Sequence, residues 1–100
     1  MKKLKGAVLY HSETKEERTI YVDGFFEAIG HIPNTAVFKG ILDMDEEGYL
    51  ITKPKSTATN VEGIFACGDC QDRTYRQAIV AAGTGAMAGI EVERFLMSTK

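Results

Sequence analysis

The sequence predicts an α/β fold, and three observations carry this prediction. Two short runs of β-branched and aromatic residues, at 7–10 and 19–22, are typical of strands. A third apolar run, at 64–67, ends at a Gly-Asp turn. From residue 75 to about 96, apolar and small residues recur at spacings of three and four, which is typical of a helix.

The first quarter of the chain predicts a β-hairpin, because the polar residues 12–18 link the first two strand-like runs through a long loop. Asp23-Gly24 then supplies turn residues. The run at 25–29 is apolar enough for a strand buried on both faces. We therefore expect a domain boundary near Gly24, with residues 1–23 in one domain and 24–100 in the next.

Shorter elements are expected in the middle of the chain. Residues 32–35 read as a loop, because proline fixes its own φ and biases the preceding residue away from helix. Residues 35–39 fit one helical turn, 43–48 an acidic turn and 49–51 a short strand. The polar residues 53–60 connect this strand to the next one.

The long predicted helix carries a stripe of very small residues, which permits close packing: Ala78, Ala82, Ala86 and Gly89. Each glycine inside a helix costs about 1 kcal/mol relative to alanine. The helix is therefore expected to be marginal unless a neighbouring surface or a cofactor lies against it. Its charged residues Glu91, Glu93 and Arg94 read most simply as solvated.

Composition limits the classes of partner. The chain has 44% hydrophobic and 26% charged residues, as ordinary soluble domains do, and a net charge of −2. Such a charge offers no field for nucleic acid or anionic lipid, so we expect neither a nucleic-acid nor a membrane partner. The apolar run after the basic start is too short for a signal peptide, which favours a cytoplasmic location.

The Gly68-Asp69 turn is the best candidate for a cofactor site. Gly68 allows a ligand to approach the backbone closely, and Asp69 places a carboxylate acceptor just beyond the carboxyl end of a strand. A sugar-like polyol would suit this acceptor. The simpler alternative is that Asp69 caps the helix that follows.

Two motifs, in order, resemble one family. The stretch TNVEGIFACGD at 59–69, followed by YRQA at 75–78 and AGTG at 82–85, closely resembles the second flavin-binding motif of bacterial, low-molecular-weight thioredoxin reductases. Upstream, FEAIGHIPNT at 26–35 resembles the segment by which that family's chain re-enters its FAD domain. The resemblance covers essentially the whole chain but only the last third of such an enzyme.

The resemblance implies the fold and the site residues. Residues 24–100 would be the carboxyl-terminal portion of a Rossmann-like FAD-binding domain, and the hairpin would end the NADPH-binding domain. Asp69, next to Gly68, would hydrogen-bond the FAD ribityl chain. The backbone of Arg76, Gln77 and Ala78 would face the pyrimidine end of the flavin, where a helix amino terminus favours negative charge.

The resemblance also implies what the whole enzyme does. Hydride would pass from NADPH to FAD and on to a dithiol that reduces thioredoxin, in a homodimer. The family's Gly-x-Gly-x-x-Gly pyrophosphate turn and its redox dithiol lie in an amino-terminal portion that these 100 residues do not resemble. The chain is therefore expected to be a partial enzyme that needs this portion as a partner and is inactive alone.

Three further patterns are weighed against simpler interpretations. Cys67 and Cys70 form a Cys-x-x-Cys, which suits a redox dithiol or half a zinc site, but Cys67 is expected to pack as a small hydrophobe and no further metal ligands lie nearby. His31 could titrate near the flavin or be structural. The Gly-x-Gly-x-x-Ala at 83–88 matches a dinucleotide fingerprint but falls inside a helical pattern, so close helix packing explains its glycines better. From these three patterns together we expect no catalytic residue and no metal site.

Two other classes of protein remain open from the sequence. The chain could be a non-enzymatic binding or assembly domain that pairs through exposed strand edges. It could also be a small thiol oxidoreductase that uses Cys67 and Cys70.

Overall fold

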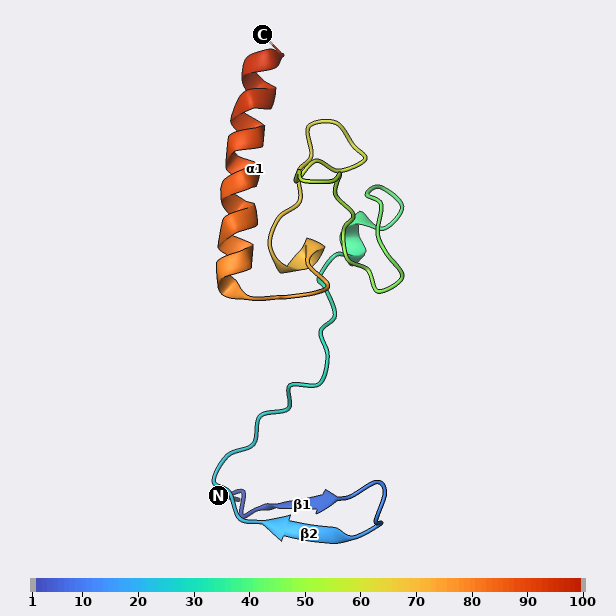
Figure 1. The fold of residues 1–100 in the computed structure, drawn as a ribbon, viewed down its shortest axis with the longest axis vertical. Helices are drawn as coiled ribbons and strands as arrows, with labels where there is room; N and C mark the ends of the chain where they lie inside the picture. Colours follow the sequence, from blue (N-terminus) through green and yellow to red (C-terminus); the bar gives the residue numbers. More distant parts are fainter. Residues whose placement is uncertain (1, 100) are drawn as a thin grey trace. The chain divides into compact units, whose positions relative to one another are not determined.

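The protein divides into two compact units in a computed structural model that describes residues 2–99. The first unit extends to Gly30 and the second begins at His31. A two-stranded sheet lies in the first unit and one long helix in the second (Figure 1). These elements fit a fragment of an α/β protein. Within residues 2–99, no helix combines the length and the apolar character that crossing a membrane requires.

The first unit confirms the predicted hairpin. Strand β1, Ala7–Tyr10, pairs antiparallel with β2, Glu17–Ile20, so that Tyr10 lies opposite Glu17. Strand β2 lies two residues earlier than expected because the loop is shorter. Lys15 adopts a left-handed φ of 63°, and its N–H donates to the His11 carbonyl at 2.9 Å, which closes the turn within residues 11–16.

The strand expected at residues 25–29 is absent. Phe25 is 65% exposed, Phe26 96% and Ile29 82%, and the segment forms no ladder with any other described residue. Apolar side chains favour a buried position, but a strand also needs a neighbouring backbone segment to pair with. None of residues 2–99 supplies that neighbour, so the prediction is wrong for this structure.

The second unit contains two single-turn helices and the long helix α1 (Figure 1). The predicted turn near residue 35 is confirmed as the 3-10 helix η1, Ala36–Phe38, and a second one, η2, spans Asp69–Gln71. Helix α1 spans Ala78–Ser98, three residues later than its predicted start. The delay arises because Arg76 has a left-handed φ of 52° and Gln77 is extended, which no α-helix accommodates.

The strands expected at residues 49–51 and 64–67 each shrink to one isolated bridge, Met44 with Leu50 and Ala58 with Phe65. Both predictions are therefore wrong in extent, since neither segment finds a partner long enough for a ladder. The acidic turn between them and η1 is confirmed by a 3.1 Å hydrogen bond from the Gly48 N–H to the Asp45 carbonyl. The buried core is small and consists of Leu42, Leu50 and Ala66, with Met44, Val61 and Cys70 packed against it.

The face of helix α1 that lies toward the rest of its unit carries both apolar and polar side chains. The less exposed positions recur at spacings of three and four: Val80, Ala81, Thr84, Gly85, Ala88, Glu91 and Phe95. The predicted small-residue stripe lies on the exposed side instead.

The prediction that Glu91 is solvated is wrong. Its carboxylate accepts hydrogen bonds from the hydroxyls of Ser56 and Thr57 and from the Thr57 N–H at 2.8 Å. Close to it, Phe95 meets Phe65 edge to face, with the ring centroids 6.1 Å apart.

Candidate functional site

The Gly68-Asp69 turn is open and anchored to α1. Gly68 has φ +82°, a region that favours glycine, and apart from its two chain neighbours no described residue has a heavy atom within 4 Å of the place where a Cβ would sit. A ligand can therefore approach this backbone. The Gly68 N–H donates to Thr84 Oγ1 at 2.9 Å, so the turn is tied to the inner face of α1. Sequence reasoning missed Thr84, because the two residues are 16 positions apart.

Asp69 carries an exposed carboxylate at the start of η2. It does not cap the long helix, because α1 begins at Ala78 with Gln77 in the cap position. The capping interpretation of Asp69 is therefore wrong for α1. Its carboxylate, next to the open Gly68 backbone, offers an acceptor to hydroxyl groups of a ligand.

A cavity of about 290 Å³ gathers several predicted residues. Asp69 and Arg76 both line it, and so does His31 from the loop upstream. Arg76 Nη1 donates to the Tyr49 hydroxyl at 3.1 Å, which fixes the guanidinium at the cavity wall. Three predicted residues are not in this wall: Gly68, Gln77 and Ala78. The complete lining is His31, Ile32, Pro33, Asn34, Tyr49, Asp69, Cys70 and Arg76.

Asp72 organises the segment between the turn and α1. It is buried, and its carboxylate accepts backbone N–H groups from Thr74 at 3.1 Å, Tyr75 at 2.9 Å and Arg76 at 2.8 Å. The hydrogen bonds from the Tyr75 and Arg76 N–H groups hold the pKa of Asp72 below its usual value. Sequence reasoning missed Asp72, although an aspartate two to four residues before free backbone N–H groups is a known turn signal.

The two cysteines are free thiols in a local turn. Cys70 Sγ donates to the Cys67 carbonyl at 3.2 Å, and Cys70 is the one that packs against the core, whereas we had expected this of Cys67. Burial raises the pKa of the Cys70 thiol, and the neighbouring Cys67 adds to that shift. A raised pKa disfavours the reactive thiolate. Within residues 2–99, no three metal-binding side chains gather into a possible site.

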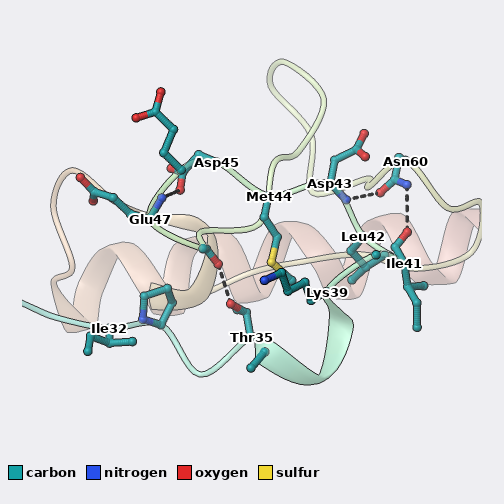
Figure 2. A pocket seen from close by; sticks show the side chains of 15 residues that line it. Ile32, Thr35, Lys39, Ile41, Leu42, Asp43, Met44, Asp45, Glu47 and Asn60 are labelled. Atoms are coloured by element: carbon teal, nitrogen blue, oxygen red, sulfur yellow. Dashed lines mark hydrogen bonds between the residues drawn. The ribbon is translucent and has the colours of Figure 1, made fainter.

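A larger hollow of about 650 Å³ lies between η1 and the acidic turn (Figure 2). Figure 2 shows Lys39 and the carboxylates of Asp43, Asp45 and Glu47 around it. Two of these carboxylates are paired, because Arg73 lies 3.4 Å from Asp45 and 3.1 Å from Glu47. None of the predicted site residues lines this hollow, so the smaller cavity is the candidate site.

Comparison with known proteins places the chain in a family. Residues 1–85 match the family described as pyridine nucleotide-disulphide oxidoreductase. A thioredoxin reductase of Dictyostelium discoideum is 59% identical over 90 residues, which are 90% of this chain and 28% of the relative. One of Rickettsia bellii is 53% identical over 95 residues, covering 95% of this chain and 31% of the relative.

Solved structures agree with the sequence matches. The crystal structure of Lactococcus lactis thioredoxin reductase gives a TM-score of 0.76 at 31% identity, over 94% of this chain and 31% of that one. That of T. acidophilum thioredoxin reductase gives 0.77 at 29% identity, over 96% and 31%. The chain thus spans just under a third of the relatives it matches. Because the family match extends over residues 1–85, the chain belongs to the pyridine nucleotide-disulphide oxidoreductase family.

Proposed function

We propose that residues 24–100 form the carboxyl-terminal part of the FAD-binding domain of a thioredoxin reductase, and that residues 1–23 end its NADPH-binding domain. The similar proteins are named thioredoxin reductases and come from bacteria such as Rickettsia and from eukaryotes such as Dictyostelium. The motif at residues 59–69 and 75–78 favours the bacterial, low-molecular-weight type. Within it, Arg76-Gln77-Ala78 favours a thioredoxin reductase over flavoproteins that reduce peroxiredoxins or ferredoxins.

The observation that carries this proposal is the open Gly68-Asp69 turn beside the cavity that Arg76 lines. An exposed carboxylate next to a glycine backbone with free space fits a polyol chain such as the ribityl group of FAD. Asp69 would accept hydrogen bonds from its hydroxyls. Gly68 would allow the close approach.

The start of α1 would hold the other end of the flavin. The backbone of Arg76, Gln77 and Ala78 leads into the first turn of α1, where the helix dipole is positive. The Arg76 N–H is bound to Asp72, so the N–H groups of Gln77 and Ala78 would be the donors that face the flavin. Such a terminus favours negative charge, which collects on the pyrimidine side of a flavin on reduction. When bound, FAD supplies the electron-carrying chemistry. The protein's residues bind it and set its electrostatics.

We propose the complete reaction for a whole reductase and not for these 100 residues alone. Electrons would pass from NADPH to FAD, then to a dithiol outside these 100 residues, and finally to thioredoxin, in a cytoplasmic homodimer. The raised pKa of Cys70 argues against Cys67 and Cys70 as that dithiol. The Gly-x-Gly-x-x-Ala at residues 83–88 lies inside α1 rather than at a strand-to-helix turn, so it supplies no pyrophosphate site.

A non-enzymatic assembly domain is the second candidate, and one observation favours it. Large apolar side chains are exposed in both units, for example Phe26 at 96% and Ile79 at 83%. Surfaces of this kind are usually covered by a partner. A reductase whose remaining domains cover them would explain the same exposure, so we prefer the enzyme.

The function is tested by comparing the 100-residue chain with a hybrid reductase. In the hybrid, this chain replaces the matching segment of the Dictyostelium relative, to which it is 59% identical. We expect the hybrid to purify with FAD and to reduce thioredoxin with NADPH. The chain alone, without a pyrophosphate turn or the family's dithiol, should neither retain FAD tightly nor turn over. A colourless, correctly folded hybrid, or steady NADPH-dependent reduction by the chain alone, would refute the proposal.

A further inference from the structure

Asp72 is buried although it is a carboxylate, with only 9% of its surface exposed. Its two oxygens divide three backbone N–H groups between them. Oδ1 accepts from Thr74 and Tyr75, and Oδ2 accepts from Arg76 at 2.8 Å. Hydrogen bonds to a charged acceptor are stronger than those to a neutral one, so this carboxylate holds residues 74–76 in one conformation.

That conformation determines how α1 begins. Arg76 has φ +52°, which non-glycine residues rarely adopt, and Gln77 has φ −111° and ψ 145° before the helix starts at Ala78. Strained backbone of this kind persists only where its surroundings fix it. Because the N–H of Arg76 is bound to Asp72, the direction of the first turn of α1 depends on this carboxylate.

The side chain of Arg76 is fixed as well. Its Nη1 donates to the hydroxyl of Tyr49, which is only 2% exposed. Tyr49, Arg76 and Asp69 all line the cavity of about 290 Å³, whereas Asp72 does not. Asp72 can therefore influence a ligand in this cavity only through Arg76 and the start of α1.

We propose that Asp72 is a positioning residue for the flavin: by fixing the Arg76 backbone it holds the start of α1 where the pyrimidine end binds. This inference rests on the proposed FAD-binding function. Tyr49 anchors the same residue through its side chain. Loss of either anchor lets the start of α1 move, and the partial positive charge of the helix then stabilises the reduced flavin less well.

Asp72→Asn in the hybrid reductase is the sharpest test. Asparagine keeps one carbonyl oxygen for Thr74 and Tyr75 but replaces the other acceptor, which Arg76 uses, by an NH₂ donor. Asp45→Asn is the matched control. Asp45 lies in the same unit and accepts the N–H groups of Glu47 at 2.9 Å and Tyr49 at 3.0 Å through Oδ1, which asparagine retains. Its Oδ2 lies 3.4 Å from the exposed Arg73 side chain, and neither residue lines the candidate cavity.

We expect Asp72→Asn to weaken FAD binding about tenfold and to shift the reduction potential of the bound flavin. Asp45→Asn should change neither quantity. A purely structural role for Asp72 would lower the unfolding temperature without moving the potential. A wild-type potential and FAD affinity in Asp72→Asn would therefore overturn the inference, while FAD lost from Asp69→Ala would leave the proposed function standing.

Tyr49→Phe keeps the inference testable if Asp72→Asn does not fold. This variant removes only the hydroxyl that accepts from Arg76 and changes no charge, so we expect a small shift of the potential to a more negative value. An unchanged potential in Tyr49→Phe would overturn the inference in that case. If the unmutated hybrid folds but binds no FAD, the proposed function fails and the inference fails with it.

Discussion

The two units of the protein are stabilised in different ways. The hairpin unit relies on the backbone ladder between β1 and β2, and it leaves Val8 65% and Tyr10 60% exposed. The second unit has only a small apolar core, but polar side chains such as Asp72, Asn60 and Glu91 bind its loops and its helix. The second unit therefore fixes its loops through side-chain hydrogen bonds, whereas the hairpin unit relies mainly on backbone pairing.

The largest expected contrast lies in amide hydrogen exchange of the 100-residue chain. An isolated two-stranded hairpin is marginal in water, so the amides of β1 and β2 should exchange almost without protection. The N–H groups of Leu50 and Ala66 are buried and donate to Cys70 and Thr57 at 2.8 Å, so they should be protected. Exchange measured by NMR decides this. Equal protection in both units would remove the distinction between them.

The sequence predicted most where the signal is local. The hairpin followed from two runs of β-branched and aromatic residues, and the long helix followed from its periodicity. The start of α1 was misplaced by three residues because the conformation of Arg76 is set by the carboxylate of Asp72 and not by helix propensity. A propensity argument has no information on such a contact.

Longer-range features could not be predicted in the same way. The apolar runs at 25–29 and 64–67 predict strands, but a strand forms only where a second backbone segment pairs with it. The sequence of the run itself does not show whether such a segment lies beside it. Tyr49 reaches Arg76 across 27 positions, and Glu91 reaches Ser56 across 35. The position of Glu91 in the helical pattern predicts a solvated residue, because the pattern carries no information on the Ser56 and Thr57 hydroxyls in a distant loop.

A smaller effect should appear in the pH dependence of stability. Hydrogen bonds from Ser56 and Thr57 hold the pKa of Glu91 below its ordinary value. Its contribution to stability is therefore complete above the unfolded-state pKa and is lost as the pH falls through the lower, folded-state pKa. Asp72 contributes with the same sign.

We expect Glu91→Gln to reduce the loss of stability on acidification, because the neutral side chain no longer takes up a proton. Glu93→Gln, on an exposed position of the same helix, should leave that slope unchanged. Urea unfolding of the chain at several acidic pH values measures both slopes. Identical slopes for the two variants would show that the contact between Glu91 and the hydroxyls does not form in solution.

The retention of FAD by an Asp69→Ala hybrid reductase tests the central claim most directly. If the Gly68-Asp69 turn binds the ribityl chain, the variant loses a charged hydrogen bond worth about 1.5–3 kcal/mol and should bind FAD about tenfold more weakly or worse. Asp43→Ala, which removes an exposed carboxylate from the same unit, serves as control and should keep its flavin. Flavin occupancy after extensive dialysis is the measurement. Depletion in Asp69→Ala alone is the predicted result, and equal occupancy in both variants would contradict the assignment of this turn to FAD.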